Sequence, residues 1–75
     1  MLRNNEVLIK DIIACLGNDS RIDLSDVIIE VDSGLVVLRG TVPTGISLSS
    51  AVKDTYSVYG VTQVRDQLEI RKSNV

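Results

Sequence analysis

The sequence predicts a single α+β domain with the element order α-β-β-α-β. Apolar residues recur at helical spacing near the N-terminus and again after residue 43, and two runs between them are rich in β-branched residues. A chain of 75 residues has room for only one core. We therefore expect one domain over residues 1–75, with a three-stranded mixed sheet and both helices packed on one face.

The first predicted helix begins at Asn4 or Asn5, since either side chain can cap it. Apolar residues then follow at steps of three and four and predict its buried face: Leu8, Ile9, Ile12, Ile13 and Leu16. Gly17 ends this helix. Cys15 lies beside the apolar face, and we interpret it as a packing residue because the sequence offers no base to activate a thiol.

Three aspartates in the next segment, Asp19, Asp23 and Asp26, raise the question of a calcium site. A calcium loop also needs a glycine at its turn and a closing bidentate glutamate, and neither stands at the required spacing. We therefore interpret the three as solvated loop and turn residues. One cysteine and no histidine exclude a disulfide framework and a Cys/His zinc site, so we expect no cofactor.

Residues 27–31 and 35–42 predict a β-hairpin, because Asp32-Ser33-Gly34 between them is a turn sequence. The alternation of side chains assigns four residues of the second strand to the core face: Val36, Leu38, Gly40 and Val42. Gly40 has no side chain to pack there. We expect it to let a helix approach the sheet closely, with a β-bulge as the alternative.

The opposite face of the hairpin is only half polar. Ile28, Leu35 and Val37 lie on it by the same alternation and predict a small exposed apolar patch, which would be the interface for a protein partner. Isolated surface apolar residues, which are common in soluble proteins, are the competing interpretation.

The second predicted helix follows Pro43 and is capped by Thr44 or Ser47. Its face recurs at helical spacing through Leu48, Ala51, Val52, Thr55 and Val58, and Gly60 closes it. Val64, Leu68 and Ile70 then share one face of a final strand, which runs parallel to the second because a helix connects them. Asp66 interrupts this face, and we expect its carboxylate to accept N–H bonds from the preceding turn.

The segment from Gly34 to Val42, GLVVLRGTV, resembles the G-x-V-x-L-x-G-x-V core of the BON domain. The later Val58-Tyr59-Gly60-Val61, followed by Val64, Asp66 and Leu68, is similar to that family's closing stretch, and Ala51 stands at its usual helical alanine. The resemblance spans essentially the whole chain and implies the same α-β-β-α-β order. Three features depart from the family pattern: Asp66 replaces the usual asparagine, residues 45–50 lack the charges common there, and only one copy is present.

The resemblance also implies a function class, a non-catalytic binding module associated with phospholipid or the bacterial cell envelope. It carries over no set of ligand contacts. The residues that match the motif have structural roles. Gly34 forms a turn, Gly40 allows close packing, Gly60 ends a helix and Val61 belongs to the core. It suggests a periplasmic or envelope location, but the sequence shows no signal peptide or membrane span, so the compartment stays unknown.

For an anionic phospholipid surface, the candidate contacts lie near the end of the second helix. Tyr56 and Tyr59 are the only aromatic residues, and tyrosine suits an interface with one apolar and one wet side. Lys53 and Arg65 are close to them in sequence and can meet anionic headgroups. In the competing interpretation, Tyr56 flanks the core and Tyr59 covers the helix end.

The alternative function is a protein-interaction or oligomerisation module, including a homo-oligomer, that uses the open sheet face or an edge strand. A net charge of −2 and dispersed cations do not predict nucleic-acid binding. An enzyme fits worst, because the sequence has no histidine, no serine beside a plausible base and no phosphate-binding glycine loop.

Overall fold

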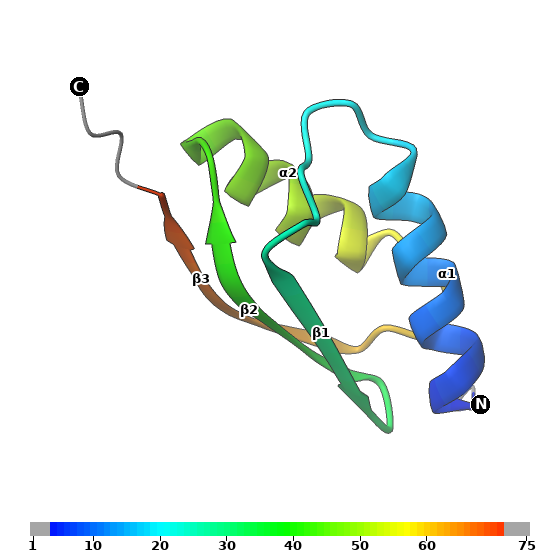
Figure 1. Ribbon diagram of the computed structural model, residues 1–75. Helices are drawn as coiled ribbons and strands as arrows, with labels where there is room; N and C mark the ends of the chain where they lie inside the picture. Colours follow the sequence, from blue (N-terminus) through cyan, green and yellow to red (C-terminus); the bar gives the residue numbers. More distant parts are fainter. Residues whose placement is uncertain (1–3, 72–75) are drawn as a thin grey trace.

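The computed structural model describes residues 4–71. The elements in chain order are α1 (Asn5–Gly17), β1 (Val27–Asp32), β2 (Leu35–Val42), α2 (Gly45–Tyr56) and β3 (Gln63–Ile70). The sheet order is β1-β2-β3, with β1 antiparallel and β3 parallel to the central β2. Both helices cover the same face of this sheet (Figure 1). The predicted fold class, element order and mixed sheet are confirmed.

The core lies between the two helices and the inner face of the sheet. Its buried apolar residues come from all the elements except β1 and from the loop before β3: Leu8, Ile12, Leu16, Val36, Leu38, Val42, Ala51, Val58 and Leu68. In residues 4–71 no helix is long and apolar enough to cross a membrane.

Helix α1 starts where an asparagine side chain replaces a missing helical acceptor. Asn4 is the N-cap, and its Oδ1 accepts the Glu6 N–H at 2.7 Å. The buried ridge repeats every four residues and excludes Ile13, whose side chain is 48% exposed. The expectation that Ile13 shares the buried face was therefore wrong, because it lies about 100° around the helix from Ile12. Cys15 is half-buried against the core, as its packing role requires.

The hairpin turns through Ser33 and Gly34, whose φ angles are +49° and +91°. Two successive positive φ values match the type I′ geometry that suits the twist of a two-residue hairpin. Gly34 is also approached from the segment before β3, because its C=O accepts the Thr62 N–H at 2.9 Å. A Cβ at Gly34 would lie 2.9 Å from the Thr62 hydroxyl oxygen. Glycine is thus required both by the turn and by this contact.

The absence of a side chain at Gly40 allows the loop before β1 to approach the sheet closely. The expectation that a helix approaches the sheet at Gly40 was therefore wrong. Its φ is +115°, and a Cβ there would overlap the carbonyl oxygen of Asp26. The same carbonyl accepts the Thr41 N–H at 3.1 Å. The register continues without an extra residue from Val27 opposite Gly40 to Asp32 opposite Leu35, so these paired strands contain no bulge.

Helix α2 is capped by Thr44, whose hydroxyl oxygen accepts the Ser47 N–H at 3.1 Å, and it ends at Tyr56. The expectation that Gly60 closes this helix was wrong, because Ser57 caps it three residues earlier. Gly60, with φ of +99°, instead shapes the turn into β3. Val61 packs half-buried against the core, in the role that its motif implies.

Asp66 binds a backbone N–H, but not one from the preceding turn. Its Oδ1 accepts the N–H of Leu68, two residues further along β3, at 3.0 Å. The predicted donor was wrong because Asp66 lies in the middle of the strand, out of reach of the turn, and next to an N–H that points away from β2.

Candidate functional site

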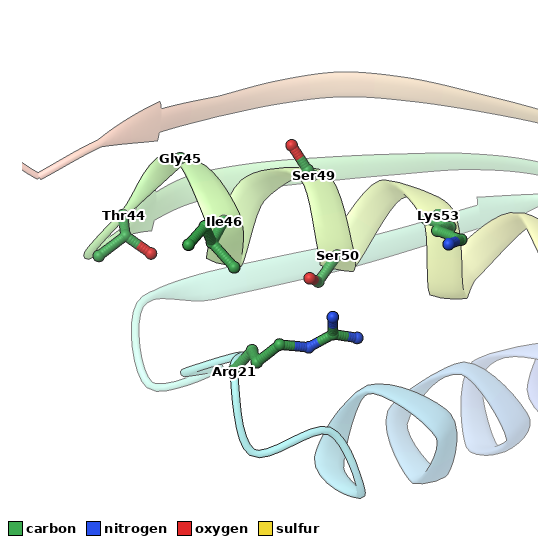
Figure 2. A pocket seen from close by; sticks show the side chains of 7 residues that line it. All are labelled: Arg21, Thr44, Gly45, Ile46, Ser49, Ser50 and Lys53. Atoms are coloured by element: carbon green, nitrogen blue, oxygen red, sulfur yellow. The ribbon is translucent and has the colours of Figure 1, made fainter.

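A hollow of about 660 Å³ lies between the loop after α1 and the N-terminal half of α2 (Figure 2). We call it the α2 hollow. Its lining combines two cations, three hydroxyl groups, a glycine and one aliphatic side chain: Arg21, Lys53, Thr44, Ser49, Ser50, Gly45 and Ile46.

One face of α2 supplies most of this lining. Ile46, Ser49, Ser50 and Lys53 follow steps of three, four and seven residues, which bring side chains together on a helix. The first turn of α2 carries no acidic side chain, so the partial positive charge at its N-terminus is not neutralised locally. The face is therefore favourable for an anion.

Arg21 comes from the loop after α1 and is held against α2 by its backbone. The hydroxyl of the buried Ser47 donates to the Arg21 carbonyl oxygen at 2.7 Å. Asp19 Oδ1 accepts the Arg21 backbone N–H at 2.9 Å, and the same carboxylate binds the guanidinium at 2.7 and 2.9 Å. Figure 2 shows the guanidinium extending along α2 beside Ser50. The cation is thus positioned by two separate anchors.

A pair of carboxyl groups modulates the charge of the hollow. The Arg21 guanidinium, by its hydrogen bonds, holds the pKa of Asp19 far below its ordinary range, and contacts with Asp54 and the Arg21 N–H lower it further. The hydrogen bond to Asp19 raises the pKa of Asp54, and desolvation adds to this effect. Asp54 therefore takes up a proton before Asp19 does, and this protonation removes a negative charge beside Lys53 and Arg21.

Aliphatic side chains stand next to these polar groups. Ile46 on the rim is 65% exposed and Ile70 at the end of β3 is 53% exposed. A Cβ on Gly45 would lie 3.7 Å from the Ile70 Cδ1, which places the Ile70 side chain beside the first residue of α2. This end of the molecule is thus amphipathic, with two exposed isoleucines beside a cationic hollow.

The four residues predicted to contact a lipid are not gathered at one place. Lys53 lines the α2 hollow, whereas Arg65 pairs in register with Val37 and so belongs to the sheet face away from the helices. Tyr56 and Tyr59 are both exposed. The Tyr56 hydroxyl accepts the N–H of Val64 at 3.3 Å, so this side chain lies against the edge of β3.

The apolar residues predicted for a protein interface lie on the far face of the sheet, as the alternation indicated. Ile28 is 62% exposed, and Leu35 and Val37 are half-buried. Ile28 lies opposite Arg39 in the hairpin, and Glu30 lies opposite Val37. Glu30 and Arg39 form an ion pair of 3.1 Å, which runs diagonally between Ile28 and Val37. The charged pair therefore separates Ile28 from the other two.

Asp23 and Asp26, in the loop after α1, have partners within the loop or at the end of β3. Asp19 instead binds Arg21 and Asp54 of α2, and its side chain is only 11% exposed, so the expectation of a solvated residue was wrong for Asp19. Asp23 accepts the Ser25 N–H at 2.9 Å and the Ser25 hydroxyl at 2.6 Å, which confirms its turn role. Asp26 pairs with Arg71 at 2.6 Å. Within residues 4–71 no group of three or more potential metal ligands comes together.

Sequence reasoning found Lys53 but missed Arg21 and the serine pair. The helical spacing of Ile46, Ser49, Ser50 and Lys53 was the signal available for the α2 side. Nothing in the local pattern linked Arg21 to it, because the connection is a bond from Ser47, 26 residues further along the chain.

The fold and the hollow together define a small binding module, built on a helix-covered sheet and provided with a cationic, hydroxyl-lined surface site. The family model of the BON domain matches residues 4–72. The chain therefore belongs to the BON domain family, a family of non-catalytic binding modules, and the resemblance seen in its motifs is confirmed. None of the curated proteins compared with the chain matches it.

Proposed function

We propose that this chain binds anionic phospholipid surfaces and that the α2 hollow receives the phosphate of a lipid headgroup. The observation that carries the proposal is the convergence of Arg21 and Lys53 on one hydroxyl-lined hollow beside two exposed isoleucines. Membership of a family associated with phospholipid binding supports it. The association with the cell envelope belongs to the same proposal.

The donors of the hollow suit a phosphate group. Lys53 forms no ion pair with any other described residue, so its ammonium is available. Arg21 forms an ion pair with Asp19 through its Nε and one terminal nitrogen, and its remaining N–H groups are free to donate to a phosphate. The hydroxyl of the exposed Ser49 adds a neutral donor, whereas Ser50 lines the hollow with only 5% of its surface exposed. Each cation near an anionic bilayer contributes about 1 kcal/mol.

The two isoleucines supply the apolar part of the contact. Entry of Ile46 and Ile70 into the boundary between headgroups and acyl chains removes exposed apolar surface from water. Full burial of one such side chain is worth about 1.5–3 kcal/mol. The net charge of −2 opposes approach to an anionic bilayer, so we expect weak and salt-sensitive binding.

Co-sedimentation with vesicles tests this proposal. Vesicles of phosphatidylglycerol mixed with phosphatidylcholine should bind the protein at low salt, and pure phosphatidylcholine vesicles should not. Lys53→Glu should lower the binding at least about tenfold, a loss of about 1.4 kcal/mol. Lys10→Glu is the matched control, because it makes the same charge change at an exposed position on α1.

Two results would contradict the proposal. Equal losses for Lys53→Glu and Lys10→Glu would mean that net charge alone determines binding. No binding to either vesicle at any salt concentration would exclude direct lipid recognition by this chain.

A further inference from the structure

The two free edges of the sheet differ in whether side chains of the protein bind their outward N–H groups. At β3, the Gln63 N–H donates to the Gly34 C=O at 3.4 Å and the Arg71 N–H donates to the Val42 C=O at 2.6 Å. With the parallel register, these bonds direct the odd-numbered residues of β3 toward β2. The even-numbered residues therefore direct their N–H groups to the free edge.

Side chains of the protein itself occupy part of the β3 edge. The Tyr56 hydroxyl accepts the Val64 N–H at 3.3 Å, and the Asp66 carboxylate accepts the Leu68 N–H at 3.0 Å. An incoming strand would have to displace both. Such coverage is one way in which proteins prevent edge strands from pairing with another chain.

The β1 edge lacks this protection. The bond from the Thr41 N–H to the Asp26 C=O and the continuous register direct the even-numbered residues of β1 toward β2. Val27, Ile29 and Val31 therefore face the free edge. The Val27 N–H is bound by the Leu24 C=O at 3.1 Å, but the N–H groups of Ile29 and Val31 have no partner among the described residues.

We propose that a second copy of this chain adds to the sheet at β1, antiparallel, with the two-fold axis at Ile29. The resulting six-stranded sheet would have the helices of both copies on one face. Helix α1 packs against β1 and α2 in the layer of helices that covers the inner face of the sheet (Figure 1). This inference concerns a different surface from the α2 hollow and does not depend on lipid binding.

The register is determined by the free donors and by charge. Centring on Ile29 pairs Ile29 with itself and Val31 with Val27 of the second copy, so that the four free N–H groups of the two chains all find carbonyl partners. Centring on Glu30 would place two carboxylates directly opposite each other, which is destabilising. With the two-fold axis at Ile28, the Ile29 N–H groups would find partners within the paired strands. The Val31 N–H groups would not, because Val31 would lie opposite a residue that precedes β1.

Side chains favour the same arrangement. On the inner face, half-buried Ile29 and Val31 gain apolar neighbours from the second copy. On the outer face, Ile28 lies opposite Glu30 of the second copy. At each end Asp32 faces Asp26 of the second copy, whose charge Arg71 already neutralises through an ion pair of 2.6 Å.

Sedimentation equilibrium from micromolar to millimolar protein tests the association. We expect a monomer–dimer equilibrium, and amide exchange at Ile29 and Val31 that slows as the dimer forms. Val31→Pro removes an N–H that has no partner within residues 4–71, and it should raise the dimer Kd at least about tenfold. Ile70→Pro is the control, because its N–H faces the free edge of β3. Circular dichroism verifies that both variants fold.

Disulfide trapping tests the register without proline. In a Cys15→Ser background, Ile29→Cys should cross-link to its copy on mild oxidation, because paired Cα atoms about 5.5 Å apart lie within disulfide range. Ile28→Cys is more exposed but off the axis, and it should cross-link more slowly. Faster trapping at residue 28, a monomer at every concentration, or a dimer lost only in Ile70→Pro would overturn the proposal.

Discussion

Gly40 shows how a single missing side chain sets the geometry of the sheet. The loop before β1 can return to β2 only because the Asp26 carbonyl occupies the space of a Cβ at this position. The positive φ of Gly40 adds a second reason for glycine, because L-residues with side chains rarely adopt it. Gly17 differs, since a Cβ there would meet no atom within 4 Å.

Gly40→Ala should therefore lower the free energy of unfolding by about 3 kcal/mol or more, through steric overlap and backbone strain. Gly17→Ala is the matched control and should raise it by up to about 1 kcal/mol, because alanine favours the helical conformation. Urea unfolding measures both. Similar stability of the Gly40→Ala variant and the unmodified chain would show that the β1 loop can move away at little cost.

The Asp19 and Asp54 carboxyls predict a pH dependence with two opposite parts. The pKa of Asp54 is raised, so the folded state binds its proton before the unfolded state does, and the free energy of unfolding rises as the pH falls toward the ordinary value of 3.8. The pKa of Asp19 is lowered, so its contribution is present above 3.8 and is lost as the pH falls further.

Asp54→Asn should remove the rise in stability that comes from protonation of Asp54, because the asparagine amide donates to Asp19 without carrying a charge. We expect this variant to be more stable at neutral pH by less than about 1 kcal/mol, the usual scale for surface charges. Its advantage should disappear as the pH approaches 3.8. Urea unfolding across this range measures the effect, and lower stability of the variant at neutral pH would contradict the assigned interaction.

At the scale of elements, α2 is both a core helix and the wall of the hollow. Its buried Ser47 faces the loop after α1, while Ser49 and Lys53 face outward. A serine in the first turn can thus hold a distant loop without leaving its own buried hydroxyl unsatisfied, because that hydroxyl donates to the Arg21 carbonyl oxygen at 2.7 Å.

Ser47→Ala should cost about 1–2 kcal/mol of stability, because the Arg21 carbonyl loses its partner. It should also weaken binding to anionic vesicles, since Arg21 is then held by Asp19 alone. Ser49→Ala is the control for stability and should change it by less than about 0.5 kcal/mol, because its hydroxyl is exposed. Unchanged stability of Ser47→Ala would show that water replaces the serine hydroxyl.

The sequence predicted the elements well because each carries its own local signal. Helical spacing, the Thr44 cap and the Ser33-Gly34 turn all act over a few residues. What it missed depends on contacts between distant segments. The partner of Gly40 is 14 residues away at Asp26, and Arg21 reaches the hollow only after α2 has packed beside its loop.

At the scale of the whole molecule, the two proposed surfaces do not compete. Helix α2 packs on β2 and β3, whereas self-association uses β1, which is the opposite edge of the sheet from β3. A two-fold axis normal to the sheet places both helix layers, and hence both α2 hollows, on the same side. A dimer would therefore meet a membrane with two headgroup sites, and the second would bind at a high effective concentration.

A rise in salt concentration should weaken lipid binding and strengthen dimerisation, because charges attract the chain to an anionic bilayer but repel two copies of the chain from each other. Binding to anionic vesicles depends on Arg21 and Lys53 and should fall as salt screens them, since the Debye length shrinks from about 10 Å at 0.1 M to about 3 Å at 1 M. Dimerisation brings together two chains of net charge −2 through backbone bonds and apolar side chains, so it should strengthen over the same range. Parallel vesicle co-sedimentation and sedimentation equilibrium measure the two trends, with sucrose as an uncharged control for excluded-solute effects. A dimer that weakens as salt rises would contradict this expectation, because attraction between charges such as Arg71 and Asp32 of the second copy would then outweigh the repulsion between the two chains.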